Sequence, residues 1–312
     1  SAQATGRRCL QAFVVPVQDV EANQSYIPYP KRIPGQMSGT LFVVATPIGN
    51  LEDLTPRARQ TLASVDLVAA EDTRHTRRLL SSFGAKAALM ALHDHNESQV
   101  VHEVIGALES GKDVALVSDA GTPLVSDPGY RLVSAAHEQG IRVEPIPGAS
   151  ALTAALSAAG LPTDRFCFEG FPPTKAAARR KWLQDLAAES RTMVFYESVH
   201  RINESLADMV EAFGAERDAF IGRELTKLHE QCVNAPLGEL QRQVDKGVIV
   251  GKGEFVVVVA GGEPAAAAEV DIDRLLTALL GRLSAKDTAH VAAEITGEKK
   301  NALYERVLQL KP

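Results

Sequence analysis

The sequence VSDAGTPLVSDPG, residues 117–129, decides the fold that we expect for this chain. The apolar run VALV at residues 114–117 leads into it and is typical of a buried strand. Glycine and proline then recur until a helix can begin near residue 130, which leaves a loop rich in exposed backbone. Such loops at the carboxyl ends of strands bind small ligands in open α/β proteins, but the same residues also suit a plain strand-to-helix turn.

Strands and helices alternate on both sides of this loop. The continuous apolar run at residues 41–45 is typical of a strand buried on both faces, and residues 66–70 and 141–146 are also predicted to be strands. Helices are indicated between them, one of them starting at the Thr55-Pro56 pair. The alternation predicts an α/β fold with a doubly wound, mainly parallel sheet in an N-terminal domain at residues 39–160.

The pattern changes after residues 160–163, which are the expected linker. Short strand candidates then alternate irregularly with helices and predict a second α/β domain with a mixed sheet, residues 164–261. Residues 269–312 are expected to form a small helical domain, in which Ser284 and Asp287 have the spacing of a capping box. Residues 1–38, rich in Gln, Pro and Ser, are expected to be a poorly ordered extension and do not resemble a secretory signal.

The composition is that of an ordinary globular protein, with 45% hydrophobic and 23% charged residues among 312. The formal net charge is -6, so a nucleic acid would have to be bound by local basic patches. Three cysteines without a CxxC pair argue against a disulfide framework, and no apolar run approaches the ~20 residues that span a bilayer. We therefore expect a cytoplasmic protein.

Several familiar signatures are excluded. Residues 106–113 nearly spell a P-loop, but Asp113 stands where Ser or Thr is needed, and the segment ends a helix. No GxGxxG motif follows the first strand and no GxSxG elbow occurs, which argues against a dinucleotide site and an α/β-hydrolase. The HDH run at residues 93–95 has no third ligand at a diagnostic spacing, so no metal is expected.

Four loops at the carboxyl ends of the predicted strands remain as the candidate site. They are residues 46–50, 71–74, 118–123 and 147–150. In a doubly wound sheet the carboxyl ends of the strands share one edge, so these loops are expected to line one ligand cleft.

Seven strings of the chain, in order, make it recognisable: ATPIGNLEDLTPRA, AEDTRHTRRLL, HDHNE, SDAGTPLVSDPG, PIPGASA, FYESVHR and GRELTKLHE. Together they closely resemble the ribosomal small-subunit RNA methyltransferase I family, within the tetrapyrrole methylase-like class. The resemblance covers about residues 39–261. It implies two α/β domains of the tetrapyrrole methylase type and a homodimer. It also implies methyl transfer from S-adenosylmethionine to the ribose 2′-oxygen of a cytidine in the decoding centre of 16S ribosomal RNA.

The resemblance also implies where S-adenosylmethionine binds, between the two domains. The residues implied as cofactor-binding are Pro47, Gly49, Asp119, Ala120, Gly121, Thr122, Pro123, Pro147, Gly148, Ala149, Ser150, Phe195, Glu197 and Arg223. For the glycines and prolines turn geometry is an alternative role, and for Glu197 and Arg223 a structural ion pair is an equal alternative.

A ribose hydroxyl is a poor nucleophile until a neighbouring group takes or orients its proton. The candidates for that group, in no order, are Asp72, Glu97, Glu197 and Lys227. The candidates for RNA binding are Arg74, Arg77, Arg78, Arg179, Arg180 and Lys181, although arginines at helical spacing also suit a merely solvated face. Trp182 and Tyr196 are possible stacking partners for a base, with a place in the core as the alternative.

Two other functions stay open at this stage. One is a methyltransferase that acts on a small, tetrapyrrole-type molecule, which the acidic net charge favours and the helical tail disfavours. The other is a non-catalytic module that binds S-adenosylmethionine or RNA and assists ribosome assembly. The polar residues retained at the strand ends, such as Asp72 and Asp119, weigh against this last alternative.

Overall fold

The computed structural model describes residues 38–93, 96–262 and 271–310. The expectations for residues 1–37 and for Asp94 and His95 lie outside the described residues. The described residues divide into two compact units, the first formed by residues 38–47 together with those between Leu51 and Ala149, and the second by Ile48–Asn50 together with those from Ser150 onward. Each unit is described by itself.

The first unit is built on a five-stranded parallel sheet of order β3-β2-β4-β1-β5. Its strands are β1 (Thr40–Val44), β2 (Leu67–Ala70), β3 (Ala88–Ala91), β4 (Val114–Val117) and β5 (Arg142–Ile146). The central strand β4 is buried at every position, as its unbroken apolar sequence predicts. The expectation of a parallel sheet in this part of the chain is confirmed.

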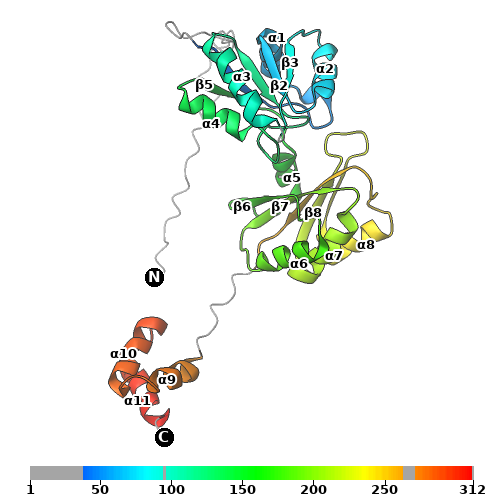
Figure 1. The fold of residues 1–312 in the computed structure, drawn as a ribbon. Coiled ribbons are helices and arrows are strands. Elements are labelled where there is room, and N and C mark those ends of the chain that lie inside the picture. The colour runs from blue at the N-terminus through cyan, green and yellow to red at the C-terminus, as the bar shows by residue number, and fades with distance from the viewer. Residues whose placement is uncertain (1–37, 94–95, 263–270, 311–312) are drawn as a thin grey trace, which may run out of the picture. The chain divides into compact units, whose positions relative to one another are not determined.

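Helices cover both faces of this sheet (Figure 1). They are α1 (Pro56–Ser64), α2 (Thr73–Ser82), α3 (Glu97–Glu109) and α4 (Tyr130–Glu138), with the short 3-10 helix η2 (Leu51–Asp53) before α1. Phe42 belongs to the core cluster that contains α1 and α2, whereas its neighbour Leu41 belongs to the cluster of α3 and α4. Since successive side chains of a strand point to opposite faces, the two helix pairs lie on opposite sides, and the fold is doubly wound.

Side-chain caps fix the starts of α1 and α2, of which the sequence predicted only the first. The Thr55 side chain accepts a hydrogen bond from the Ala58 N–H at 3.1 Å, with Pro56 in the first turn of α1. Asp72 caps α2 by accepting from the Arg74 N–H at 2.8 Å. The loops after β1 and β2 are therefore fixed in place by the helices that follow them.

The second unit contains a mixed sheet of order β6-β7-β10-β8-β9, in which β6 and β7 are parallel and the other pairs antiparallel. Its strands are β6 (Phe166–Gly170), β7 (Thr192–Ser198), β8 (Asp218–Arg223), β9 (Gln231–Pro236) and β10 (Glu254–Val259). Helices α6 (Ala176–Asp185), α7 (Ile202–Phe213) and α8 (Leu237–Asp245) contribute to its core. The mixed sheet is as predicted.

Helix α5 (Ala151–Ala159) contacts strands of this second sheet, namely β8, β9 and β10. The Asn234 side-chain amide also donates a hydrogen bond to the carbonyl of Ala159 at the end of α5. The sequence places this helix at the end of the first domain, and the boundaries at residues 160 and 261 stay predictions. The contacts made by α5 arise from its alanine-rich surface, which lets a helix approach a sheet closely.

The C-terminal residues form three helices, α9 (Ile272–Leu280), α10 (Ala285–Thr296) and α11 (Lys300–Leu310), as the sequence predicts. Their own small core consists of Leu276, Ala289, Ala292, Leu303 and Val307. The Ser284 hydroxyl accepts from the Asp287 N–H and donates to its carboxylate, so the predicted capping interaction is present. In the described part of the chain, every helix is too short or too polar to cross a bilayer.

Candidate active site

The strand order of the first sheet creates a topological switch point between β1 and β4. The chain leaves β1 for α1 on one face and leaves the adjacent β4 for α4 on the other. Where neighbouring strands send their connections to opposite faces, the loops at their carboxyl ends separate and leave room for a ligand. The two loops concerned, beginning at Thr46 and at Ser118, are two of the four that the sequence singles out.

The loop after β4 is hydrogen-bonded to the loops after three other strands. Thr46 and Gly121 form an isolated bridge, with N–H to O distances of 2.9 and 3.1 Å. The Asp119 carboxylate accepts from the Asp72 N–H at 2.9 Å, after β2. The Thr122 hydroxyl donates to the Ala149 carbonyl at 3.1 Å, after β5. The structure thus brings these predicted loop residues of the first unit together around the loop after β4.

This central loop has an unusual backbone. Leu124 and Ser126 have positive φ angles of 72° and 68°, and Gly121 and Gly129 have 83° and 123°. A Cβ on Gly129 would lie 2.8 Å from Leu116 Cδ2, so glycine is needed there for space as well as for conformation. Left-handed residues other than glycine cost free energy and are concentrated at functional sites.

Asp127, in the same loop, is a candidate that the sequence reasoning missed. Burial raises the pKa of its carboxyl to about 6; a hydrogen bond from Ser118 opposes the rise and the nearby charge of Asp119 adds to it. A carboxyl that titrates near neutral pH suits proton transfer. The sequence feature that could have identified Asp127 is the occurrence of two Asp residues, Asp119 and Asp127, in one glycine- and proline-rich loop at a strand end.

Two of the four predicted proton acceptors lie in the first unit and have partners. Both carboxylate oxygens of Asp72 are bound by the Arg74 guanidinium, at 2.7 and 3.1 Å, and the hydrogen bonds from Arg74 hold its pKa well below the usual range. Glu97 is buried and accepts from the N–H groups of Gly129 and Arg131, which holds the start of α4. Neither carboxylate is readily available to a substrate proton.

The other two predicted acceptors lie in the second unit. The carboxylate of Glu197 is buried and bonded to the Ser205 hydroxyl and the Arg201 guanidinium. Lys227 Nζ lies 2.9 Å from Glu224 and 3.0 Å from Glu254. Burial alone would lower the pKa of Lys227, but the hydrogen bonds to these carboxylates outweigh it and raise the pKa, which keeps the amine protonated.

The predicted cofactor residues differ in how much of them is accessible. In the first unit Pro147, Gly148 and Ala120 are at least partly exposed, and a Cβ on Gly148 would meet that of Ala45 at 3.0 Å. Backbone of this kind is open to a ligand. In the second unit Phe195 is fully buried in the hydrophobic core, so its side chain faces the helices.

Gly49 and Arg223 are positioned by close contacts within the second unit. A Cβ on Gly49 would lie 2.3 Å from Lys227 Cγ, and the neighbouring Asn50 N–H donates to Thr226 Oγ1 at 3.1 Å. The Arg223 guanidinium donates to the backbone carbonyls of Lys252 and His229. Ser150 precedes α5 as its N-cap residue without a side-chain capping bond.

The basic candidates fall into two kinds. Arg77 and Arg78 are exposed on α2, as is Arg74 despite its ion pair. Arg180 and Lys181 are exposed on α6. Arg179 differs, because its side chain is 1% exposed and bonded to Asp208 at 2.6 Å and to Glu204 at 3.1 Å; it joins α6 to α7 and is unavailable to an RNA backbone.

The two aromatic candidates pack within the second unit. The Tyr196 hydroxyl accepts from the Leu152 N–H at 3.1 Å, and its ring meets Phe168 edge to face. Trp182 packs edge to face on Phe195, with ring centroids 5.8 Å apart. Both rings have core contacts of the kind that the sequence left as the alternative. In the residues that the structure describes, His, Cys, Asp and Glu form no cluster suited to a metal ion.

Comparison with known proteins decides the family. The model of the tetrapyrrole (corrin/porphyrin) methylases matches residues 40–241, and that of the RsmI C-terminal HTH domain matches residues 266–311. The ribosomal RNA small subunit methyltransferase I of Pseudomonas aeruginosa is 54% identical over 277 residues, which are 87% of this chain and 98% of that protein. This chain belongs to the ribosomal RNA small subunit methyltransferase I family. The family member from Escherichia coli O157:H7 is 51% identical over 275 residues, 87% of this chain and 95% of its own length.

Solved structures confirm the fold of this methyltransferase I family member. The methyltransferase CobJ superposes with a TM-score of 0.54 at 20% identity, over 72% of this chain and 95% of that one. Diphthine synthase also gives 0.54, at 16% identity, over 71% of this chain and 90% of its own. The family and the fold class predicted from the sequence are both confirmed.

Proposed function

We propose that this chain transfers a methyl group from S-adenosylmethionine to small-subunit ribosomal RNA. The observation that carries the proposal is the identity of about half of all residues, over nearly the full length of relatives named as ribosomal RNA small subunit methyltransferase I. The finer proposal, from the resemblance in the motifs, is that the acceptor is the ribose 2′-oxygen of a cytidine in the decoding centre of 16S ribosomal RNA.

The residues at the ends of β1, β4 and β5 suit the methyl donor. S-adenosylmethionine supplies an electrophilic methyl group on a sulfonium cation and carries polar amino-acid and adenosine groups. The Asp119 and Asp127 carboxylates add negative charge at this edge, which favours a cation, and the exposed backbone at Ala120 and Gly148 suits hydrogen bonding to polar groups. The cofactor residues predicted from the resemblance stay the proposed set, with Phe195 limited to its backbone atoms.

We propose that the Asp127 carboxylate is the base that accepts the proton of the ribose hydroxyl. As the new oxygen–carbon bond forms, the hydroxyl proton must pass to a base, and a group with a pKa near neutrality is best matched to that task. Asp127 has a pKa of about 6 in a strained loop of the candidate site. Asp72, Glu97, Glu197 and Lys227 stay as the alternatives predicted from the sequence, each with the ion pairs or hydrogen bonds described for it.

The RNA surface that we propose consists of the exposed part of the predicted set: Arg74, Arg77, Arg78, Arg180 and Lys181. With a net charge of -6 for the whole chain, such local groups have to provide the attraction to phosphate. Helix α2 has no acidic residue within Thr73–Ser82, so its exposed face is basic despite the Asp72 carboxylate at its start. We also propose a homodimer, which the family resemblance implies, and a cytoplasmic location, which three cysteines without a CxxC pair favour.

Incubation of the purified chain with labelled S-adenosylmethionine tests the function directly. Free 16S-type RNA and assembled small subunits serve as alternative substrates, and the methylated riboses are mapped by nuclease digestion and mass spectrometry. We expect label in one ribose of the decoding centre. Tight S-adenosylmethionine binding without label in either RNA would refute the enzyme, and label in an added porphyrinoid instead of RNA would favour the small-molecule alternative.

A further inference from the structure

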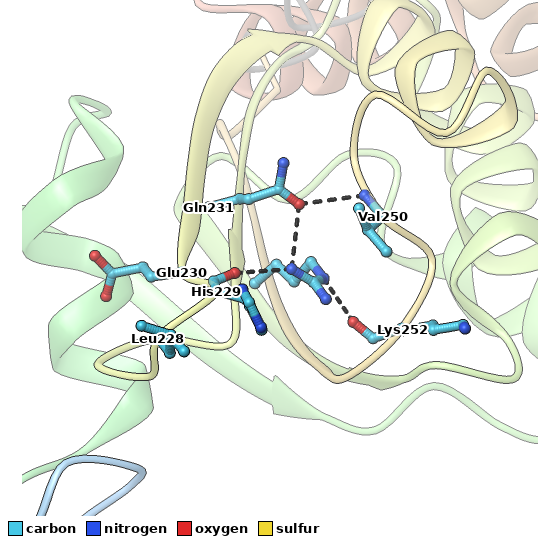
Figure 2. A pocket seen from close by; sticks show the side chains of 7 residues that line it. Leu228, His229, Glu230, Gln231, Val250 and Lys252 are labelled. Atoms are coloured by element: carbon cyan, nitrogen blue, oxygen red, sulfur yellow. Dashed lines mark hydrogen bonds between the residues drawn. The ribbon is translucent and has the colours of Figure 1, made fainter.

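A pocket of about 610 Å³ lies in the second unit beside the loop that joins β8 to β9. Its lining residues are Arg223, Leu228, His229, Glu230, Gln231, Val250 and Lys252 (Figure 2). We propose that this pocket binds an unpaired base of the RNA substrate, next to the nucleotide that is methylated, with Leu228 against the face of the base. This inference rests on the proposed function and adds a second contact between the enzyme and its RNA.

The loop that carries Leu228 is held in one conformation before any ligand arrives. Glu224 and Thr226 have positive φ angles of 49° and 68°. The Thr226 N–H donates to the Glu230 carboxylate at 2.6 Å, and the Glu230 N–H donates back to the Lys227 carbonyl at 3.1 Å. A strained backbone that is fixed by its own hydrogen bonds is preorganised, so little conformational entropy is lost on binding.

The same loop leaves the Leu228 side chain exposed to solvent. Leu228 is 93% exposed, and Val250 across the pocket is 42% exposed. Neither side chain belongs to the hydrophobic core of this unit. The flat face of a base is apolar, so it would cover both side chains and gain hydrophobic free energy.

The charge of the pocket suits a phosphodiester. The buried Arg223 guanidinium donates to the carbonyls of Lys252 and His229, at 2.5 and 2.8 Å, and to the amide oxygen of Gln231 at 3.3 Å. All three acceptors are uncharged, so the charge of the guanidinium is offset only through space, by the neighbouring Glu224 carboxylate. Lys252 adds a second cation, and Glu230 is the single carboxylate among the lining residues, which leaves the pocket with a net positive charge.

The pocket wall is itself braced. The Gln231 amide oxygen accepts from the Val250 N–H at 3.2 Å, which ties the loop before β10 to the start of β9 (Figure 2). The Gln231 amide nitrogen donates to the Val248 carbonyl at 3.1 Å. Both loops that border the pocket are therefore fixed relative to each other within this unit.

The loop also contacts a predicted cofactor segment. Thr226 accepts a hydrogen bond from the Asn50 N–H, and the Lys227 side chain lies so close to Gly49 that a Cβ at this position would force it to move. One stretch of chain thus contacts the proposed cofactor residue Gly49 through Lys227 and lines the pocket from the next residue, Leu228, onward. A base held there is expected to belong to the RNA segment that presents the acceptor ribose.

Two variants of the full chain test the pocket. Leu228→Ala removes the exposed apolar contact, and Val248→Ala is the matched control, because Val248 is 60% exposed on the same loop as Val250 but does not line the pocket. Affinity is measured for a decoding-centre RNA fragment that carries 2-aminopurine at unpaired positions beside the methylated nucleotide. S-adenosylmethionine affinity, thermal stability and oligomeric state are measured in parallel.

We expect Leu228→Ala to weaken RNA binding about tenfold, as the loss of part of one buried leucine implies. The rise in 2-aminopurine fluorescence on binding should be lost, while S-adenosylmethionine affinity stays unchanged and Val248→Ala behaves as the unmodified chain. Unchanged RNA affinity in Leu228→Ala would overturn the pocket alone. A changed oligomeric state with unchanged RNA affinity would instead assign the surface to a second copy. If the unmodified chain neither binds nor methylates the RNA, the proposed function itself fails.

Discussion

Asp127→Asn is expected to make the protein more stable and less active. The substitution keeps the size of the side chain and removes its charge. The pKa of Asp127 rises from 3.8 to about 6 in the folded chain because burial and Asp119 disfavour the carboxylate. A difference of this size corresponds to roughly 3 kcal/mol against the charged form. Solvent still reaches part of the carboxyl, so about 1.5 kcal/mol is a more realistic gain in the free energy of unfolding.

The pH dependence of the gain follows from the sign of the shift. A carboxyl whose pKa is higher in the folded than in the unfolded chain destabilises the fold at pH values above the folded pKa, here about 6. The cost shrinks as the pH falls through 6 and disappears below the unfolded value. Urea unfolding at pH 7.5 should therefore show the full gain, and unfolding at pH 4.5 a much smaller one.

Activity should change in the opposite direction. If Asp127 accepts the ribose proton, methyl transfer to RNA at pH 7.5 falls at least about 100-fold in the Asn variant. In the unmodified enzyme the rate should drop about tenfold per pH unit below 6, and this acidic limb should vanish in the variant. Asp66→Asn is the control, since Asp66 accepts from the Asp113 N–H at the amino end of the same sheet. A stabilised variant with normal activity and an unchanged pH profile would refute the catalytic role, and a destabilised one would refute the charge argument.

Three further outcomes are expected. Arg179→Ala should lower the free energy of unfolding by about 3 kcal/mol, because it leaves the Asp208 carboxylate uncompensated. RNA affinity should show no specific loss. Urea unfolding measures the first effect and filter binding the second. Arg77→Glu combined with Arg78→Glu should weaken RNA binding at least about tenfold and flatten its salt dependence, with S-adenosylmethionine affinity unchanged by calorimetry; an equal loss of both would make the patch structural. Asp119→Ala should lower S-adenosylmethionine affinity about tenfold, as loss of a charged partner implies, and unchanged affinity would leave Asp119 with only its bond to the Asp72 N–H.

The site was predictable where local sequence carries the information. A loop of glycine and proline after a buried strand has few alternatives to the rim of a sheet, and β4 with its following loop lies where residues 114–129 predict. The strand order was not predictable, because it depends on which strands pair across long separations. That order makes β1 and β4 neighbours and so brings Thr46 to Gly121.

The sequence by itself determined four of the five strands of the first sheet, the loops at their ends and the family, because each depends on residues close together in the chain. The edge strand β3 was not among the predicted strands. Only the tertiary structure decided which charged residues have partners. Lys227 meets Glu254 and Arg179 meets Asp208, pairs separated by 27 and 29 residues. It also decided that Asp127 is half-buried beside Asp119, and that Leu228 is exposed beside a pocket. Burial and electrostatic interaction depend on distance in space, and distance in the chain does not reveal them.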